Sequence, residues 1–272
     1  MVELQSVKAR FEKQGIRLAA ISYDSEAILK YFADRQHIDF PLLADPDSRV
    51  IRDYHVLNTE AVGQFQGMAR PGYFFVGPDG VIRERFFEAK YRERLSGNNV
   101  IAKLFPELGQ EVVSTIEAPH LEVSIQQSDR TGVPGSLVTL VTEVRLPPET
   151  HVYAPGTKGY KPIELVIGST PNLEFRPTVY PQSKILFMPA IQERVPVFEG
   201  SFRIRQDVKV SSVAEFSGSL GTAGKTLTIH GTLHYQACDN KTCFLPNTVP
   251  VDWQLRVLPL DRQRAPEEIR HK

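Results

Sequence analysis

Over the first hundred residues, the spacing of apolar positions switches repeatedly between the helical and the strand period. Helical spacing predicts helices over residues 2–14, about 25–37 and 91–105. A further helix, entered at residues 45–48, is expected to turn Val50, Ile51 and Tyr54 inward. Short apolar runs predict strands over residues 16–22, 40–43, 73–76 and 81–87. This order of elements is typical of an α/β layer fold.

The pattern changes after Phe105-Pro106. From His120 onward we find no convincing helix, and short alternating segments are separated by Pro/Gly turns. The predicted strands cover residues 120–127, 136–146, 163–168, 173–180, 195–210, 225–237 and 249–258. Such a series is typical of an antiparallel β-sandwich. Two long loops, 147–162 and 181–194, interrupt it, and long loops on a rigid sandwich are where binding surfaces usually lie.

This change of pattern predicts two domains. A chain of 272 residues is long enough for two domains that each bury their own core. We expect an α/β domain, a linker, an all-β domain and a polar C-terminal tail. Their bounds are 1–106, 107–119, 120–260 and 261–272.

Composition excludes several classes of partner. The 32 Lys+Arg residues balance 32 Asp+Glu residues, which gives no electrostatic basis for binding nucleic acid or an anionic membrane. No apolar run approaches the roughly 18 residues that span a bilayer, so we expect no membrane span. Residues 1–20 also lack the profile of a secretion signal.

The two cysteines of the chain, Cys238 and Cys243, fall in one short window. The residues between them, 239–242, suit a four-residue hairpin loop, which would place the cysteines opposite each other. Opposed Cα atoms lie about 4.5–5.5 Å apart, within reach of a disulfide. Because the inward positions of both flanking strands are odd-numbered, a 238:243 pairing requires a bulge near Pro246.

Three uses of such a pair stay open at this point. A structural disulfide that closes so small a ring contributes only about 2 kcal/mol. A redox-active pair exchanges disulfides with partners. A metal site would add His230 and His234, which share a strand face with Cys238, but two histidines on a wet face are more often plain surface, and we predict no metal and no cofactor.

Residues 2–105 resemble the greater part of a peroxiredoxin domain of the alkyl hydroperoxide reductase/thiol-specific antioxidant (AhpC/TSA) family, which has the thioredoxin fold. The stretches that carry the resemblance are 3–5, 19–25, 40–46 and 73–80. In that family the peroxidatic cysteine lies at the start of the helix that here begins near Met1. No cysteine precedes Cys238, so we expect no peroxide reduction by this half, and we expect the natural start of the protein to lie upstream.

Pro71 is a second departure from that family. Peroxiredoxins usually carry an arginine at this place, and here Arg70 lies one residue away. A proline resembles instead the cis-proline of thioredoxins, so Pro71 is a candidate cis-proline. The alternative is an ordinary turn proline.

Residues 118–258 resemble the amino-terminal periplasmic domain of DsbD, the thiol:disulfide interchange protein. The resemblance is strongest over 234–246, where Tyr235-Gln236-Ala237-Cys238 matches the Tyr-Gln-x-Cys hairpin of that immunoglobulin-like domain. It implies that Cys238 and Cys243 are the exchanging thiols and that the partners are thioredoxin-like redox proteins. Four residues separate the cysteines here, where the best-known members have five.

The same resemblance implies that aromatic residues shield the pair. Tyr153 and Phe187 fall where the family has its tyrosine-bearing wall and its cap, and Tyr235 and Phe244 flank the cysteines. The alternative is that these side chains only anchor loops, and Tyr235 in particular alternates inward with the core.

These observations predict a thioredoxin-like α/β domain followed by an all-β immunoglobulin-like sandwich that exchanges disulfides through Cys238 and Cys243. The alternative is a non-catalytic binding or scaffold protein with a structural disulfide. Replacement of Cys243 by serine is expected to trap partners through Cys238. The resemblance implies an extracytoplasmic location if a signal segment precedes the chain, and a cytoplasmic one otherwise.

Overall fold

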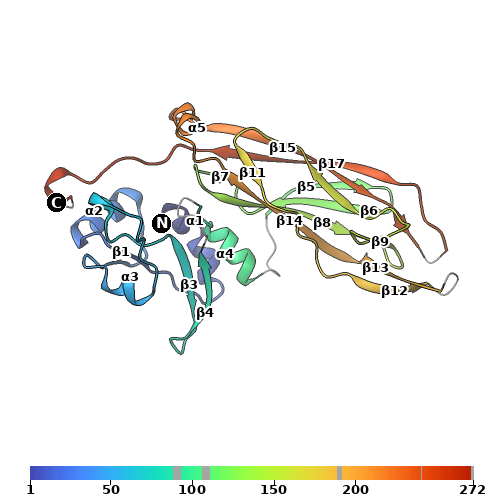
Figure 1. Cartoon of the computed structure of the whole chain (residues 1–272), viewed down its shortest axis with the longest axis horizontal. Helices are drawn as coiled ribbons and strands as arrows, with labels where there is room; N and C mark the ends of the chain where they lie inside the picture. The colour runs from blue at the N-terminus through green and yellow to red at the C-terminus, as the bar shows by residue number, and fades with distance from the viewer. Residues whose placement is uncertain (88–92, 106–110, 189–191, 240, 271–272) are drawn as a thin grey trace. The chain divides into compact units, whose positions relative to one another are not determined.

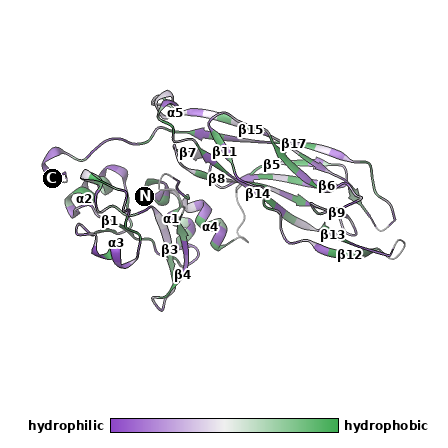
Figure 2. Ribbon diagram, viewed as in Figure 1, coloured by the Kyte–Doolittle hydropathy of each residue, from purple (hydrophilic) through white to green (hydrophobic). Residues whose placement is uncertain are grey.

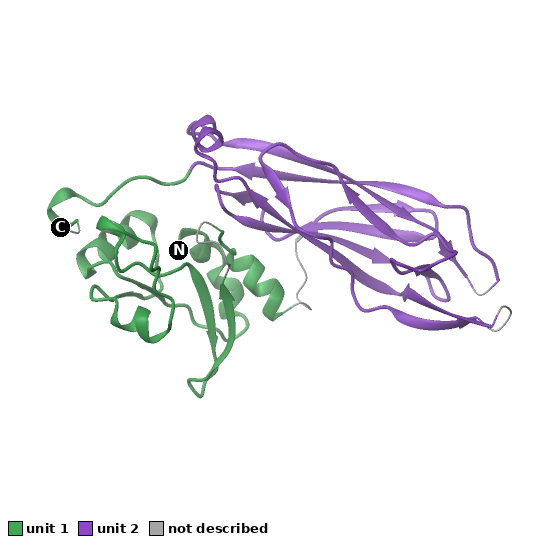
Figure 3. Cartoon of the chain, in the orientation of Figure 1, with its two compact units in different colours: residues 1–107, 260–272 green, residues 108–259 purple. Residues whose placement is uncertain are grey.

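The computed structural model describes residues 1–270 except 88–92, 106–110, 189–191 and 240 (Figure 1). The chain divides into two compact units (Figure 3). Unit 1 comprises residues 1–107 and 260–272, and unit 2 comprises residues 108–259.

Unit 1 mixes helices and strands, as the alternation of periods predicts. Its elements in chain order are α1 (Val2–Glu12), β1 (Ala20–Ser22), α2 (Glu26–Gln36), β2 (Leu42–Ala44), α3 (Arg49–Asp53), β3 (Gly72–Val76), β4 (Ile82–Phe87) and α4 (Gly97–Leu104), with a 3-10 turn η1 (Gly63–Phe65). Strands β1 and β2 pair in parallel and β3 and β4 pair antiparallel, as two separate two-stranded sheets in the described residues.

The helices of unit 1 follow their sequence signals closely. In α1 the buried residues are Leu4, Val7 and Phe11. The Ser25 hydroxyl caps α2 by accepting the Ile28 N–H. Helix α4 is shorter than the predicted 91–105 and begins at Gly97, because Ser96 caps it through a capping box with Asn99; residues 91–92 lie outside the described residues.

Close approach explains the glycine at that junction. The Gly97 N–H donates to the Glu3 carboxylate at 2.7 Å. A Cβ atom on Gly97 would lie 2.6 Å from a methyl group of Val7, so a larger residue would push α1 and α4 apart.

Two details of unit 1 differ from the predictions. Val50 and Tyr54 are exposed, and of the predicted inward face of α3 only Ile51 is buried, because α3 is a single short turn. Of the two alternatives for Pro71, the candidate cis-proline is contradicted, since the described residues contain no cis peptide bond. The Arg70 N–H donates to the Val56 carbonyl just before β3, and the chain reaches β3 with the trans form that an X–Pro bond prefers.

The first residues of the C-terminal tail are anchored on α2. The Asp261 carboxylate pairs with Arg35 at 2.7 Å and accepts a hydrogen bond from Gln36 at 2.8 Å. Gln263 donates to the Tyr31 hydroxyl. The start of the polar tail predicted at 261–272 therefore makes specific contacts with unit 1.

Unit 2 is built from strands. They are β5 (Glu111–Ala118), β6 (Leu121–Gln127), β7 (Thr131–Gly132), β8 (Leu137–Arg145), β9 (His151–Tyr153), β10 (Glu164–Ile167), β11 (Leu173–Phe175), β12 (Lys184–Met188), β13 (Glu193–Glu199), β14 (Ser201–Val210), β15 (Lys225–Tyr235), β16 (Ala237–Cys238) and β17 (Asn247–Val257). They form three sheets with strand orders β11-β14-β8-β6-β5, β10-β15-β17-β7 and β12-β13-β9-β16.

One core lies mainly between the first two of these sheets. Val123 and Ile204 from the first and Leu233 and Val251 from the second are fully buried in it. Alternation of hydrophobic and hydrophilic residues is visible along the strands (Figure 2). The Trp253 indole N–H donates to the Gln126 carbonyl at 2.9 Å, which ties the second sheet to the first.

Four predictions for this region need correction. Residues 111–118 of the predicted linker form the edge strand β5, while 107–110 lie outside the described residues. Each predicted long loop contains a strand, β9 in one and β12 in the other, because their partner β13 lies between them. The predicted strand 195–210 is two strands, broken at Gly200 with φ 64°. A short helix, α5 (Ala214–Ser219), lies where none was expected.

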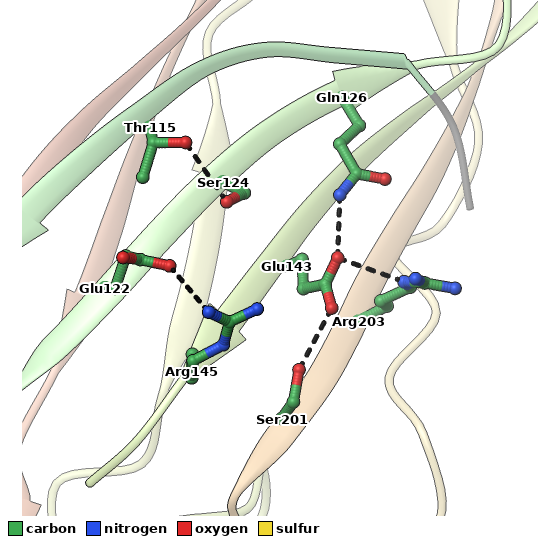
Figure 4. Close-up of polar contacts among 8 residues, drawn as sticks. All are labelled: Thr115, Glu122, Ser124, Gln126, Glu143, Arg145, Ser201 and Arg203. Atoms are coloured by element: carbon green, nitrogen blue, oxygen red, sulfur yellow. Dashed lines mark hydrogen bonds and ion pairs between the residues drawn. The ribbon is translucent and has the colours of Figure 1, made fainter. Parts of the chain in front are cut away.

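A polar cluster covers the outer face of the first sheet, and we call Gln126, Glu143, Ser201 and Arg203 the Glu143 cluster (Figure 4). The Glu143 carboxylate accepts hydrogen bonds from Gln126 at 2.7 Å, Ser201 at 3.0 Å and Arg203 at 3.3 Å. Burial alone would raise the pKa of Glu143, but these donors and the Arg203 charge outweigh it, so the pKa is lowered.

Candidate functional site

The third, small sheet brings together residues that are about 85 positions apart in the chain. Strand β9 lies between β13 and β16, with Val152 opposite Ala237 and His151 opposite Cys238. Val152 and Ala237 belong to the main core. Because neighbouring residues of a strand point to opposite faces, His151, Tyr153 and Cys238 share the other face.

Cys238 and Cys243 form a disulfide with their Cα atoms 4.0 Å apart. They lie opposite each other in an isolated antiparallel bridge. Tyr235 lies opposite Asn247, whereas the Phe244 N–H donates to the Ala237 carbonyl, so the returning strand holds one extra residue at Leu245-Pro246. The bulge that the sequence predicts near Pro246 is confirmed.

Asp239 shapes the turn between the cysteines. Its carboxylate accepts the N–H groups of Lys241 and Thr242, both at 2.7 Å, and its own N–H donates to the Thr242 carbonyl. These two hydrogen bonds, and then the Lys241 charge, lower the pKa of Asp239. Asn240, part of the predicted loop, lies outside the described residues.

The two sulfurs differ in access. Cys238 is 0% exposed, whereas Cys243 is an exposed residue. The Tyr153 hydroxyl lies 3.7 Å from Cys238 Sγ and 3.6 Å from Cys243 Sγ. Burial, and then the charge of Glu193, raises the pKa of Tyr153, so its hydroxyl stays protonated at neutral pH and is able to donate to either sulfur.

A second, smaller core surrounds the buried sulfur. Cys238 packs with Tyr153, Val195 and Val197, and Leu186 and Met188 lie against this cluster. Tyr160 stacks on Tyr153 with ring centroids 4.2 Å apart. The Tyr160 hydroxyl donates to Glu193 at 2.6 Å, a bond that raises the pKa of Tyr160 to about 12.

The other residues predicted to shield the pair lie at different places. Phe244, next to Cys243, is half-buried and stacks on His120 with ring centroids 3.6 Å apart. Tyr235 is a core residue whose hydroxyl donates to the Pro119 carbonyl at 2.8 Å. Phe187 is 47% exposed beneath the Arg194 guanidinium. Its neighbours in β12, Leu186 and Met188, face the small core, so Phe187 points to the opposite side of this sheet.

His151, two residues before Tyr153, was not among the predicted site residues. His151 is 2% exposed, and in the described part of the chain its Nε2 atom has no hydrogen-bond partner. Burial lowers the pKa of His151, against the raising effect of Glu199 and Asp239. Side chains alternate between the two faces of a strand, so residue 151 is expected on the same face as Tyr153. This alternation is the signal that could have indicated His151.

The metal alternative receives no support from the positions of His230 and His234. His230 pairs with Asp252 at 3.0 Å. In the ranges that the structure describes, no three His, Cys, Asp or Glu side chains are grouped to hold a metal ion. The helices described here include none that is long and apolar enough to cross a membrane.

The start of the chain is similar to known proteins. Residues 1–85 match the AhpC/TSA family. Alkyl hydroperoxide reductase C of Staphylococcus epidermidis is 26% identical over 85 residues, which are 30% of this chain and 42% of that protein. Peroxiredoxin TSA1 of Saccharomyces cerevisiae is 33% identical over 90 residues, 30% of this chain and 43% of that protein. The chain thus spans less than half the length of these relatives.

Two solved structures resemble part of the chain. The N-terminal periplasmic domain of ScsB from Proteus mirabilis has a TM-score of 0.37 and 14% identity, and the match covers 56% of this chain and 55% of that one. The N-terminal domain of DsbD from Neisseria meningitidis, in its reduced form, has a TM-score of 0.28 and 13% identity over 42% of this chain and 74% of that one.

Proposed function

We propose that this chain, whose residues 1–85 match the AhpC/TSA family, exchanges disulfides with redox partners through Cys243 and Cys238. One observation carries the proposal: the disulfide joins an exposed cysteine to a fully buried one, and a single buried hydroxyl lies against both sulfurs. A cross-link that only stabilises needs neither the exposed sulfur nor the donor.

The exposure difference sets the direction of attack. A partner thiolate attacks Cys243 Sγ, the disulfide breaks, and Cys238 leaves as a thiolate while Cys243 carries the mixed disulfide. The Tyr153 hydroxyl donates to the thiolate as it forms inside an apolar cluster, where an unpartnered charge is costly. A second partner thiol then attacks the mixed disulfide, so two electrons pass from the partner dithiol to the pair.

The remaining assignments rest on resemblance. We assign unit 2 to the immunoglobulin-like, DsbD-type domains and unit 1 to the thioredoxin-like fold, with a thioredoxin-like dithiol protein as partner. Both cysteines of this chain lie in unit 2, so the peroxide chemistry named for the relatives of residues 1–85 is not part of the proposal.

The proposal is tested by trapping. Because Cys243 is exposed and Cys238 buried, the variant that should hold partners as mixed disulfides is Cys238→Ser, not the Cys243→Ser variant that the sequence suggested. Cys243→Ser is then the matched control and should trap little. We expect Cys238→Ser, once Cys243 has been converted to its mixed disulfide with thionitrobenzoate, to form a mixed disulfide with thioredoxin lacking its resolving cysteine, and one thionitrobenzoate leaves for each disulfide formed.

Equilibration of the whole chain with glutathione buffers supplies the second readout. An exchanging pair should show a reduction potential above about −300 mV. A potential below about −300 mV together with no trapped thioredoxin would favour the scaffold alternative, in which the disulfide is structural.

A further inference from the structure

His151 is a buried titratable side chain that the exchange steps above leave unused. Four buried side-chain atoms lack a hydrogen-bond partner in the described residues, and they belong to Arg35, Gln127, Thr142 and His151. Of these groups only an imidazole changes protonation near neutral pH. Buried polar atoms are nearly always satisfied, so an imidazole nitrogen without a partner calls for an explanation.

The position of His151 supplies an explanation for the unpartnered nitrogen. His151 lies directly opposite Cys238 in the β9–β16 pair, and the Cβ atoms of opposite residues are about 4.5–5.5 Å apart on the same face. Tyr153 is the next residue on that face, with its ring centroid 5.5 Å from the His151 ring and its hydroxyl against both sulfurs. The imidazole therefore belongs to the same small group as the disulfide.

Cys238 needs a proton acceptor when it is reduced. A thiol must lose its proton before it attacks a disulfide, and burial among apolar side chains raises the pKa of a thiol. The Tyr153 hydroxyl stabilises a thiolate as a donor but is a poor base. The His151 imidazole, opposite Cys238 and with Nε2 unpartnered in the described residues, supplies a base beside this thiol.

We propose that His151 is the acid–base partner of Cys238, an inference that rests on the proposed exchange function. In the oxidising direction the His151 ring takes the proton of the Cys238 thiol, and the thiolate attacks Cys243 Sγ of the mixed disulfide. The Cys238–Cys243 bond forms, the bond to the partner breaks, and the partner leaves as a thiolate. In the reducing direction the His151 ring takes up a proton from water and, as the imidazolium, gives it to the Cys238 thiolate.

The charges around the ring are compatible with both directions. Burial favours the neutral imidazole, which is the form that accepts a proton. The acidic groups that act on it are Glu199, opposite His151 on β13, and Asp239, directly after β16. Both favour the imidazolium once a proton has been transferred, and the Tyr153 hydroxyl stays neutral.

A two-step thiol reaction isolates this proton transfer. The reduced whole chain is mixed with dithiobis(nitrobenzoate): attack by the exposed Cys243 releases one thionitrobenzoate, and attack by Cys238 on the mixed disulfide releases a second. We expect His151→Gln to slow the second release about tenfold or more at neutral pH, with the first release unchanged. The matched control His234→Gln, on the exposed face of β15, should leave both releases unchanged.

Two further measurements keep the test independent of folding. His151→Phe keeps a ring in the buried site without a nitrogen and should slow the same step. In the unmodified chain, the rate of the second release should follow a group that titrates below the ordinary thiol pKa of about 8.5.

The outcomes separate the two proposals. A second release with the same rate and the same pH profile in wild type and His151→Gln would overturn the role of His151 and leave the exchange function standing. An unmodified chain that releases only one thionitrobenzoate, and does not re-form the Cys238–Cys243 disulfide, would contradict the exchange function itself.

Discussion

The Glu143 cluster and the disulfide site both hold half-buried or buried polar groups on unit 2. The two sites differ in how many hydrogen-bond partners these groups have. Glu143 receives three donors and is fully engaged on the outer face of its sheet. At the disulfide site the His151 Nε2 atom has no partner in the described residues, and the Tyr153 hydroxyl lies against two weak acceptors. A satisfied cluster stabilises one structure, whereas unsatisfied groups beside a disulfide are available for chemistry.

The largest effect should come from removing the ring that packs on the disulfide. Tyr153 is fully buried, so Tyr153→Ala leaves a cavity and should lower the free energy of unfolding of the oxidised protein by about 3–5 kcal/mol. Denaturant unfolding of the oxidised chain measures it. The control Tyr153→Phe keeps the packing and should cost much less. Equal losses in the two variants would show that the hydroxyl, rather than the ring, supports this site.

An intermediate effect is expected at the polar cluster. Glu143→Ala removes the carboxylate that accepts from Gln126 and Arg203 and should cost about 1–3 kcal/mol of unfolding free energy. On the same face, Glu122 pairs with Arg145 at 3.4 Å in a mostly exposed ion pair, and Glu122→Ala should cost no more than about 1 kcal/mol. If both variants cost the same in denaturant unfolding, Glu143 contributes no more than a surface charge.

The smallest effects concern pH and sharpen the comparison. The lowered pKa of His151 means that the unfolded chain binds a proton first, so stability should begin to fall as pH drops below the ordinary histidine value of about 6.5. The lowered pKa of Glu143 gives stability that is present above the ordinary glutamate value of about 4.3 and lost as pH falls further.

Two variants test which residue causes the loss of stability in each pH window. His151→Phe should flatten the unfolding free energy in the upper window only, and Glu143→Gln should flatten it in the lower window only. Unfolding curves of the three proteins over both windows provide the measurement. Unchanged pH dependence in His151→Phe would mean that this imidazole keeps its ordinary pKa in the folded chain.

Local signals predicted much of the fold. The apolar spacing of α1 and α2 marked those helices, since helical periodicity is a local property of the chain. Parity along β15 and β17 predicted the bulge near Pro246, because side-chain alternation is a property of each strand alone. The short strands β9 and β12 escaped prediction because three to five residues carry too little periodicity.

Part of the candidate site could likewise be predicted from the sequence, and part depended on the fold. Spacing alone indicated that Cys238 and Cys243 are able to pair, and the DsbD resemblance pointed to Tyr153. It also pointed to Tyr235 and Phe187, which the structure places in the core and on the opposite side of the small sheet. Which side of a short strand faces the sulfurs depends on the neighbours of that strand, and these come from distant parts of the chain.

By itself, then, the sequence determined an α/β region followed by a β region, with both thiols in one hairpin of the second. It did so because periodicity and turn chemistry are local. Only the tertiary structure decided that Cys243 is exposed and Cys238 buried, and that His151 lies opposite Cys238. Burial and cross-strand pairing arise when β9, β13 and β16 pair in one sheet. These strands come from distant parts of the chain, so local sequence patterns do not predict their pairing.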